Sequence, residues 1–195
     1  MGMLSLLFAA ILLLGLMMAY RQKLEKSRNN YQDSFVALKI ALSCRHQAVK
    51  YVLDAAQLYL LNDHTIEPKL LIACTEAEQA LSRAAKSFSS ESVAVLSSAE
   101  AKLNGLLKEM QPLLDINPLA CSDKRLSAQL EMLDAAESDV VVARRAYNRA
   151  AERYNQLTNR FPFALCAGCM GYKSSAGLVK FQDNNVTQMS RQLLV

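Results

Sequence analysis

The first twenty residues are the most apolar stretch of the chain. The segment MGMLSLLFAAILLLGLMMAY contains no charged side chain. As an α-helix, this segment would span about 30 Å, the thickness of the hydrocarbon core of a bilayer. Four basic residues and one acidic residue follow between Arg21 and Arg28, whereas no basic residue precedes the segment. This asymmetry predicts a single-pass anchor in the cell membrane over 1–20, with the N-terminus outside and the rest of the chain in the cytoplasm.

A cleaved signal peptide is the alternative interpretation of this segment. Such peptides carry a basic region before a shorter apolar core, and small residues mark the cleavage site. Here the positive charge follows the apolar core, and LMMAYR contains no convincing cleavage site. We therefore expect the anchor to be retained, and N-terminal sequencing of the mature protein tests this expectation.

Beyond residue 30, apolar side chains recur at alternating intervals of three and four residues. This spacing is typical of helices that pack against each other. No glycine or proline lies between Gly15 and Pro68, so the apolar segment can continue into a long first helix. The apolar positions of the first three segments are Phe35, Leu38, Leu42, Val49, Val52, Ala56 and Tyr59, then Leu70, Cys74, Ala77, Leu81, Ala84 and Phe88, then Leu96, Ala99, Leu103, Leu106, Met110 and Leu113.

Turn-forming residues separate these segments. The stretch NDHTIEP at 62–68 predicts the first turn, and SFSSES at 87–92 ends the second helix and offers serine N-caps for the third. A further break is expected around Pro118, and the fourth helix should begin near Asp123 and end near Arg160. The pattern therefore predicts an all-α fold, in which an N-terminal transmembrane helix is followed by an antiparallel, up-and-down four-helix bundle.

Composition agrees with this fold and narrows the function. Hydrophobic residues make up 52% and aromatic residues 7%, with no tryptophan, which suits helices better than a β-sandwich. The net charge of +4 is spread along the chain, so no nucleic-acid partner is expected. We divide the chain into a transmembrane anchor (1–20), a basic juxtamembrane segment (21–30), a helical bundle (31–162) and an irregular tail with glycines and cysteines (163–195).

A repeated dipeptide stands out in the fourth helix. Tyr147-Asn148 recurs seven residues later as Tyr154-Asn155. Because Val140 lies seven residues before Tyr147, both tyrosines belong to the buried seam of the helix. Each asparagine then lies beside the seam, where its amide can form hydrogen bonds to a neighbouring element. Packing therefore suffices to explain the repeat, and catalysis is the alternative.

The stretch ARRAYNRAAERYN, followed by RFP, GY and Phe181, resembles the C-terminal signature of the LemA family. Upstream, Glu100 and Glu137 stand where the family tends to keep such residues, together with Leu126 and Leu130. The resemblance implies a bacterial protein with one N-terminal membrane helix, a helical-bundle domain and no generally established enzymatic reaction. The matching signature positions are Ala143, Arg144, Tyr147, Asn148, Tyr154, Asn155, Phe161 and Pro162.

The resemblance is weaker in the first helix of the bundle. The family usually carries a basic pair, an aspartate and a Pro-Asn pair there, whereas this chain has LSCRHQAVKYVLDA. Arg45 keeps one basic position, but Gln47, Lys50 and Tyr51 replace the family's aspartate, proline and asparagine. We therefore predict a divergent member, to which roles of the replaced residues do not carry over.

Arg45 also occupies an unusual place in the heptad pattern. It lies on the seam between Leu42 and Val49, where an apolar residue is expected. A buried arginine requires a carboxylate partner, and Glu137 or Glu100 can supply one from another helix. We predict that such a pair fixes the register of the helices without taking part in catalysis. The alternative is that Arg45 extends to the surface.

Other chemically capable residues form no catalytic set. The five cysteines are an odd number in a chain predicted to face the cytoplasm, which argues against disulfides. Cys166 and Cys169 have redox or zinc-site spacing, but no second cysteine pair and no sheet accompany them. His46 and His64 lack a nucleophile or carboxylate at catalytic spacing, so we expect structural or surface roles. We expect no catalytic residue, cofactor or metal.

The tail after Pro162 mixes aromatic residues with glycines and is too interrupted to span a membrane. We expect it to pack across the end of the bundle. Binding to the membrane surface and docking of a partner are the alternatives.

These patterns favour a non-enzymatic scaffold or adaptor. Residues 1–20 would hold the bundle at the membrane, and an exposed face would bind an unidentified protein partner. Heptad seams are also compatible with a homo-oligomer. The alternative is an accessory subunit of a membrane protease or envelope-remodelling complex, in which the partner supplies the chemistry.

Overall fold

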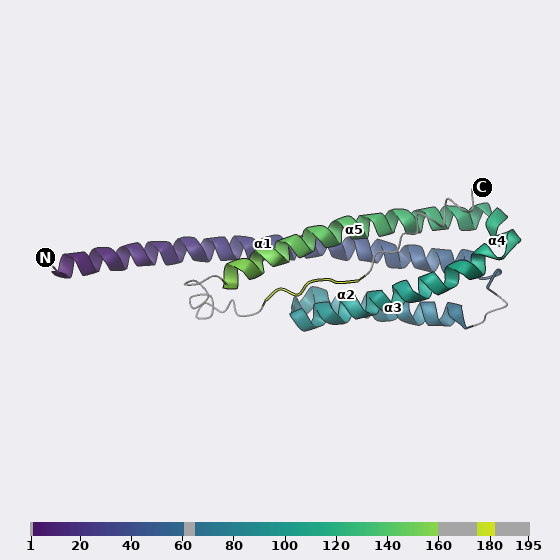
Figure 1. The fold of residues 1–195 in the computed structure, drawn as a ribbon, viewed down its shortest axis with the longest axis horizontal. Helices are drawn as coiled ribbons and strands as arrows, with labels where there is room; N and C mark the ends of the chain where they lie inside the picture. The colour runs from purple at the N-terminus through teal and green to yellow at the C-terminus, as the bar shows by residue number, and fades with distance from the viewer. Residues whose placement is uncertain (1, 61–64, 160–174, 182–195) are drawn as a thin grey trace.

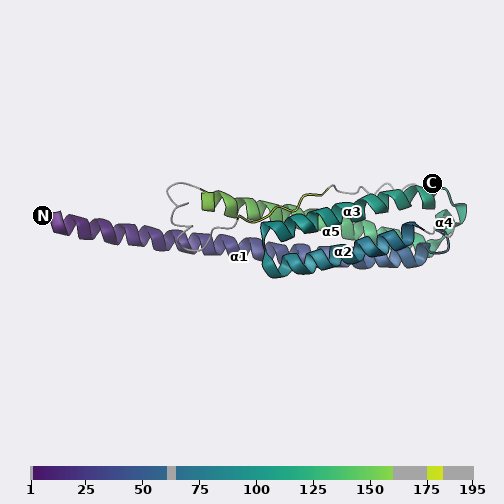
Figure 2. The same ribbon diagram turned by 90° about the horizontal axis from the view of Figure 1, so that it is seen from below.

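The computed structural model describes residues 2–60, 65–159 and 175–181 (Figure 1). Its helices are α1 (Gly2–Ala56), α2 (Ile66–Ser87), α3 (Ser90–Asp115), α4 (Pro118–Ser122) and α5 (Lys124–Asn159). Helices α1 and α5 lie side by side in opposite directions, and α2 and α3 form a second pair (Figures 1 and 2). Within the described ranges all regular structure is helical, which confirms the predicted all-α class.

Helix α1 is a single helix of 55 residues and about 80 Å. The prediction that the apolar segment continues into the first helix is therefore confirmed. Its N-terminal part projects beyond the other helices (Figure 1), and large apolar side chains from Met3 to Met18 are exposed there. Among the described residues, this is the one helix whose length and composition suit a membrane span. Packing begins at Tyr20 and Leu24, which are buried against Leu157 of α5.

The turn between α2 and α3 follows from its serines and one unusual backbone conformation. Phe88 adopts a left-handed conformation with φ of 50°, and its ring packs edge-on against Phe35 at 5.5 Å between centroids. Ser89 then caps α3, because its hydroxyl oxygen accepts a hydrogen bond of 3.1 Å from the backbone N–H of Ser92. The serine cap predicted within 87–92 is confirmed.

The break predicted around Pro118 contains a short helix that the sequence pattern did not indicate. Asn117 caps α4 with its side chain, and Pro118 occupies a first-turn position where a missing N–H is tolerated. Asp123 caps α5 by accepting a hydrogen bond of 2.7 Å from the backbone N–H of Arg125. The hydroxyl of Tyr59 also donates to Asp123, at 2.7 Å, which ties the end of α1 to the start of α5.

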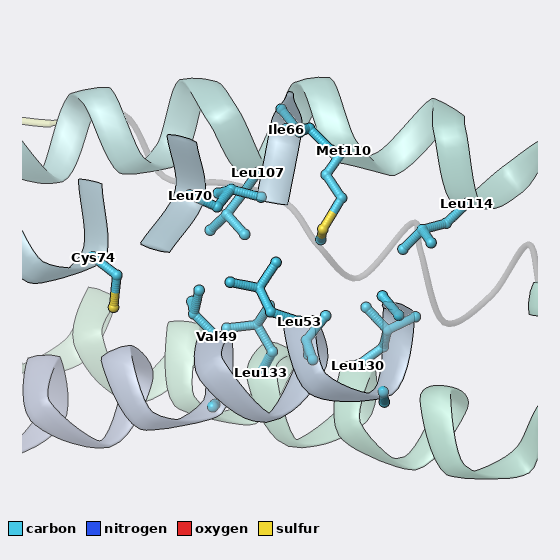
Figure 3. Packing of buried hydrophobic residues seen from close by; sticks show 14 of the residues in the cluster. Val49, Leu53, Ile66, Leu70, Cys74, Leu107, Met110, Leu114, Leu130 and Leu133 are labelled. Atoms are coloured by element: carbon cyan, nitrogen blue, oxygen red, sulfur yellow. The ribbon is translucent and has the colours of Figure 1, made fainter. Parts of the chain in front are cut away.

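The core consists of two apolar clusters that follow one another along the helices. The first lies toward the α1–α2 turn (Figure 3), and the second lies toward the end of the packed helices from which α1 projects. Labelled members of the first are Val49, Leu53, Ile66, Leu70, Cys74, Leu107, Met110, Leu114, Leu130 and Leu133, and members of the second include Tyr31, Phe35, Leu38, Leu42, Leu81, Leu96, Val140, Tyr147 and Tyr154.

The predicted seams of α1, α2 and α5 match the buried faces well, whereas the seam of α3 is displaced. Of its six predicted positions, Leu96, Leu103 and Met110 are buried, whereas Ala99, Leu106 and Leu113 are only partly buried. The buried face instead includes Glu100 and Asn104, which are 0% and 5% exposed. It also includes Val93, Leu107 and Leu114, so the buried face is rotated relative to the predicted seam.

Residues 175–181, here called the tail segment, form no helix or strand. Within it, Ala176 and Val179 are buried in the second apolar cluster. The tail segment runs along the side of the helices (Figure 1), whereas the tail was expected to pack across their end. The rest of the predicted tail, 163–174 and 182–195, lies outside the described residues. The packed core therefore combines residues from the predicted bundle and from the predicted tail.

Candidate functional site

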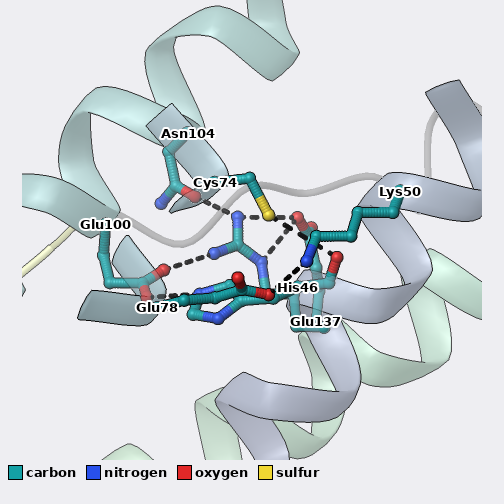
Figure 4. Close-up of polar contacts among 8 residues, drawn as sticks. His46, Lys50, Cys74, Glu78, Glu100, Asn104 and Glu137 are labelled. Atoms are coloured by element: carbon teal, nitrogen blue, oxygen red, sulfur yellow. Dashed lines mark hydrogen bonds and ion pairs between the residues drawn. The ribbon is translucent and has the colours of Figure 1, made fainter. Parts of the chain in front are cut away.

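Arg45 lies at the centre of a buried polar cluster that joins three helices. Figure 4 labels its partners Glu100, Asn104 and Glu137. The Arg45 side chain is 2% exposed, and its Nη1 lies 2.7 Å from Oε2 of Glu100 on α3. Both Nε and Nη2 lie 3.3 Å from Oε1 of Glu137 on α5. Nη2 also donates to the side-chain oxygen of Asn104. The structure thus brings the predicted residues Arg45 and Glu137 together, with Glu100 as a second carboxylate partner.

His46 belongs to the same cluster, a role that sequence reasoning did not assign to it. Its Nε2 lies 2.7 Å from Oε1 of Glu100, and both side chains are fully buried. Glu100 therefore bridges the imidazole and the guanidinium of Arg45. The Nδ1 atom of His46 has no hydrogen-bond partner among the described residues. One guanidinium therefore faces two carboxylates, one of which also contacts the imidazole.

These five residues, Arg45, His46, Glu100, Asn104 and Glu137, are called the polar layer. On α3, Glu100 lies between Leu96 of one apolar cluster and Leu103 of the other, and on α1 and α5 the layer residues separate the same two clusters. On α1, Leu42 belongs to one cluster and Ala48 to the other, with the layer residues between them. On α5, Ala136 and Val140 flank Glu137 in the same way. A single polar layer between apolar halves is an arrangement that can specify helix register.

An ion pair and a cysteine lie at the edge of the polar layer (Figure 4). Lys50 Nζ lies 2.6 Å from Oε1 of Glu78, and this hydrogen bond raises the pKa of the Lys50 ammonium. Cys74 is buried, with its sulfur 3.6 Å from the carbonyl oxygen of His46. Burial, followed by the charge of Glu78, raises the pKa of the Cys74 thiol to about 11. The thiol is therefore protonated at neutral pH and is a poor nucleophile.

A second constellation comprises the two asparagines of the Tyr-Asn repeat. Asn148 donates from Nδ2 to the carbonyl of Val179 at 2.9 Å, and its Oδ1 accepts from the N–H of Val179 at 2.9 Å. Asn155 forms the same pair of bonds with Ala176, at 2.9 and 2.8 Å. Each side-chain amide thus satisfies both backbone groups of one residue in the tail segment.

The seven-residue spacing of the asparagines matches the geometry of the segment they hold. Seven residues of α-helix advance about 10.5 Å, whereas three residues of extended chain advance about 10 Å. Asn148 and Asn155 are seven residues apart, and their partners Val179 and Ala176 are three apart in the opposite direction. The repeat is therefore a device for binding an extended segment antiparallel to a helix, and we call it the asparagine clamp.

Two further hydrogen bonds hold the tail segment beside the clamp. The buried hydroxyl of Tyr147 donates to the carbonyl of Gly177 at 2.7 Å. Burial first, and then the neighbouring Tyr31, raises the pKa of the Tyr147 hydroxyl. On the other side, the backbone N–H of Lys180 donates to Ser97 of α3 at 3.1 Å. The tail segment therefore lies between α5 and α3 and contacts both helices.

The remaining signature residues have distinct positions. Arg144 donates to the carbonyl of Phe181, and its guanidinium lies 4.7 Å from the centre of that aromatic ring. Tyr154 is buried with its ring 4.9 Å from that of Tyr31, and Ala143 is partly buried beside the second cluster. Phe161 and Pro162 lie outside the described residues.

The cysteine and histidine predictions are only partly covered by the structure. Cys166, Cys169 and His64 lie outside the described residues. Cys44 is exposed and Cys121 is partly buried, each as a free thiol. Within the described part of the chain, no group of three or more histidine, cysteine or acidic residues is placed to hold a metal ion.

The sequence analysis did not assign His46 or Asn104 to the polar layer, although the sequence contained a signal for Asn104. Glu100 and Asn104 are four residues apart on α3, so they lie on one helical face among buried leucines. That spacing could have identified Asn104 as a further partner of Arg45. The pairing of His46 with Glu100 depends on how two helices pack and has no counterpart in local sequence.

Comparison with known proteins supports the resemblance read from the signature. Searches of curated proteins and of solved structures give no significant match. The family model described as "LemA family" matches residues 34–190. This range contains the polar layer, the asparagine clamp and the divergent stretch around Arg45. Because the match covers well over half of the chain, the protein belongs to the LemA family.

Proposed function

We propose that this protein is a membrane-anchored scaffold or adaptor, without an enzymatic reaction of its own, at the cytoplasmic face of a bacterial membrane. The observation that carries the proposal is the continuity of α1, which extends from the apolar segment into the packed domain as one helix. A continuous helix has no flexible linker, so it holds the domain in a defined orientation to the membrane. Confinement at a membrane also raises the effective concentration of partners there.

The orientation and topology form part of the same proposal. The basic flank from Arg21 to Arg28 supports a cytoplasmic domain and an external N-terminus. The pairing of α1 with α5, and of α2 with α3, supports an up-and-down four-helix bundle. The packing of Tyr20 and Leu24 against Leu157 supports a bundle seated directly on the membrane, because the packed domain begins where the apolar segment ends.

The burial of the polar layer supports a structural role for its charged residues. Arg45, His46 and Glu100 are 2%, 0% and 0% exposed, so a substrate would have to open the core to reach them. Catalytic groups normally line a concave site that a substrate can enter. We therefore assign the polar layer to holding the helices in register.

Crosslinking in native membranes followed by mass spectrometry tests the scaffold. The matched control joins residues 1–20 to an unrelated soluble domain, so that partners captured by the anchor alone are subtracted. Several partners specific to the full chain are expected. A specific set no larger than that of the control would contradict the scaffold, and one stable partner with enzymatic activity would favour the accessory-subunit alternative.

A further inference from the structure

A pocket of about 500 Å³ lies between α1 and α5, just beyond the apolar segment. We call it the interfacial pocket. Lys23, Lys26 and Asn30 of α1 line one side, and Arg153 and Gln156 of α5 line the other. Its volume falls in the range of sites that bind small molecules. No residue of the polar layer or of the asparagine clamp takes part in it.

The charge of the interfacial pocket favours an anion. Lys23, Lys26 and Arg153 contribute three cations, and no acidic residue is among its described lining residues. In the part of the chain that the structure describes, these three side chains form no ion pair. Converging cations with adjacent amide donors are the groups that bind phosphate oxygens.

The two helices bring the polar residues that line the pocket to one place before any ligand binds. Lys23, Lys26 and Asn30 are three and four residues apart, so they share one face of α1. Next to this face, the buried contact of Leu24 with Leu157 fixes α5 against α1. The site is therefore formed by two packed helices, not by a flexible basic tail.

The position of the interfacial pocket along α1 indicates where the anion comes from. Lys23 and Lys26 lie about 5 and 9 Å along the helix beyond Tyr20, the last residue of the apolar segment. The headgroup region of a bilayer extends about 5–8 Å beyond each side of the hydrocarbon core. The pocket would thus open at the level of the lipid phosphates.

We propose that the interfacial pocket binds a phosphate anion, and that the headgroup of an anionic phospholipid supplies it. This inference rests on the proposed membrane anchoring, because only an inserted α1 brings the pocket to the headgroup level. Lys26 and Arg153 hold the phosphate from opposite helices, and Asn30 and Gln156 supply neutral hydrogen-bonding groups. The bound lipid would then fix the depth and rotation of the domain at the membrane surface.

The test uses the full chain in a non-ionic detergent and four soluble probes. These are dihexanoyl phosphatidylglycerol, dihexanoyl phosphatidylcholine, glycerol 3-phosphate and inorganic phosphate. The variant Lys26→Gln/Arg153→Gln removes one cation from each wall, and the charge-matched control is Arg21→Gln/Arg149→Gln, which alters exposed residues outside the pocket. We expect saturable binding of the phosphatidylglycerol, weakened about tenfold or more in the pocket variant and less than about twofold in the control.

Each other result decides against part of the proposal. Equal weakening in both variants, or equal binding of the phosphatidylcholine, would overturn a specific phosphate site. Equal binding of inorganic phosphate or glycerol 3-phosphate would keep the phosphate site but overturn its lipid source. Failure of the anchor is distinguishable, because alkaline carbonate would then release the full chain from native membranes, whatever the pocket binds.

Discussion

The polar layer and the asparagine clamp both place polar side chains inside the bundle, but they solve different problems. The polar layer joins helices to each other through charged groups, as in the contacts of Arg45 with Glu100 and Glu137. The clamp joins a helix to an irregular segment through neutral amides, as in the contact of Asn148 with Val179. One arrangement depends on charge balance, and the other depends on backbone geometry.

This difference determines how each region should respond to damage. A charge left alone in the polar layer stays buried, because the helices around it also carry the rest of the core. A backbone group left alone in the clamp can reach water if the tail segment detaches. The layer should therefore be critical to the whole domain, whereas the clamp should be critical mainly to the tail segment.

The largest effect is expected from Arg45→Met. This change leaves the carboxylates of Glu100 and Glu137 buried without their cation, and should lower the free energy of unfolding by about 3–5 kcal/mol. Denaturant titration of the full chain in detergent, followed by circular dichroism, measures the loss. The exposed Arg145→Met is the control and should stay within about 0.5 kcal/mol of the wild type. An unchanged or raised melting temperature for Arg45→Met would remove support for a required ion pair.

A variant without the charges of Arg45, Glu100 and Glu137 tests whether the polar layer sets helix register independently of its effect on stability. The variant Arg45→Met/Glu100→Gln/Glu137→Leu should recover most of the lost stability, because apolar substitutes often replace buried ion pairs without loss. If the layer sets register, spin labels at positions 54 and 125 should then show a broader distance distribution. In the wild type these positions face each other, since Arg125 Nη2 lies 2.5 Å from Asp54 Oδ2. A single narrow distance in the uncharged variant would show that packing alone sets register.

A smaller and more local effect is expected from Asn148→Ala/Asn155→Ala. The change removes all four hydrogen bonds of the clamp, but the freed backbone groups can be hydrated when the tail segment detaches. The expected loss is about 1–3 kcal/mol, less than four separate bonds would suggest. Hydrogen exchange should show loss of protection at residues 175–181 while the helical amides near Arg45 stay protected.

The exposed Asn159→Ala provides the matched control for the clamp, because it removes an asparagine amide from the same helix. It should leave the exchange of residues 175–181 unchanged. Persistent protection of those residues in the double variant would mean that apolar burial of Ala176 and Val179, not the clamp, holds the tail segment.

The contrast between the two regions also explains what the sequence could predict. Heptad spacing located the helices because burial of apolar stripes is a local, periodic signal. The same pattern identified Arg45 as a charge within an apolar stripe. Because such a charge requires a partner of opposite sign, Glu100 and Glu137 became the candidates. The partners of Asn148 were hidden, because a side-chain amide that binds a backbone imposes no residue type on the segment it holds.

Alanine substitutions at two glycines should change the stability of the protein in opposite directions. A Cβ at Gly177 would lie 2.9 Å from the Cα of Ser90 and from the Cβ of Val93, so Gly177→Ala forces the tail segment away from α3. We expect a loss of about 1–3 kcal/mol. Gly105→Ala meets nothing within 4 Å and should gain about 0.5–1 kcal/mol, because alanine favours helix. Thermal unfolding of both variants measures the difference, and a neutral Gly177→Ala would contradict close packing of the tail segment.

The smallest expected effect compares two ion pairs on the outside of the bundle. Lys50–Glu78 borders the polar layer with side chains 36% and 40% exposed, whereas Lys102–Glu76 is 53% and 48% exposed. Lys50→Met and Lys102→Met should each cost less than about 1 kcal/mol at neutral pH, with the larger loss for Lys50→Met.

The raised pKa of Lys50 predicts how the stability difference between the wild type and Lys50→Met depends on pH. Because folding raises this pKa above its ordinary value of 10.5, the Lys50 contribution is fully present below that value and is lost as the pH rises through the folded pKa. Denaturant titrations at increasing alkaline pH should therefore bring the wild type and Lys50→Met together. A difference between them that stays constant with pH would assign the loss to packing of the Lys50 stem and not to its charge. The Lys50–Glu78 ion pair would then contribute nothing measurable to stability.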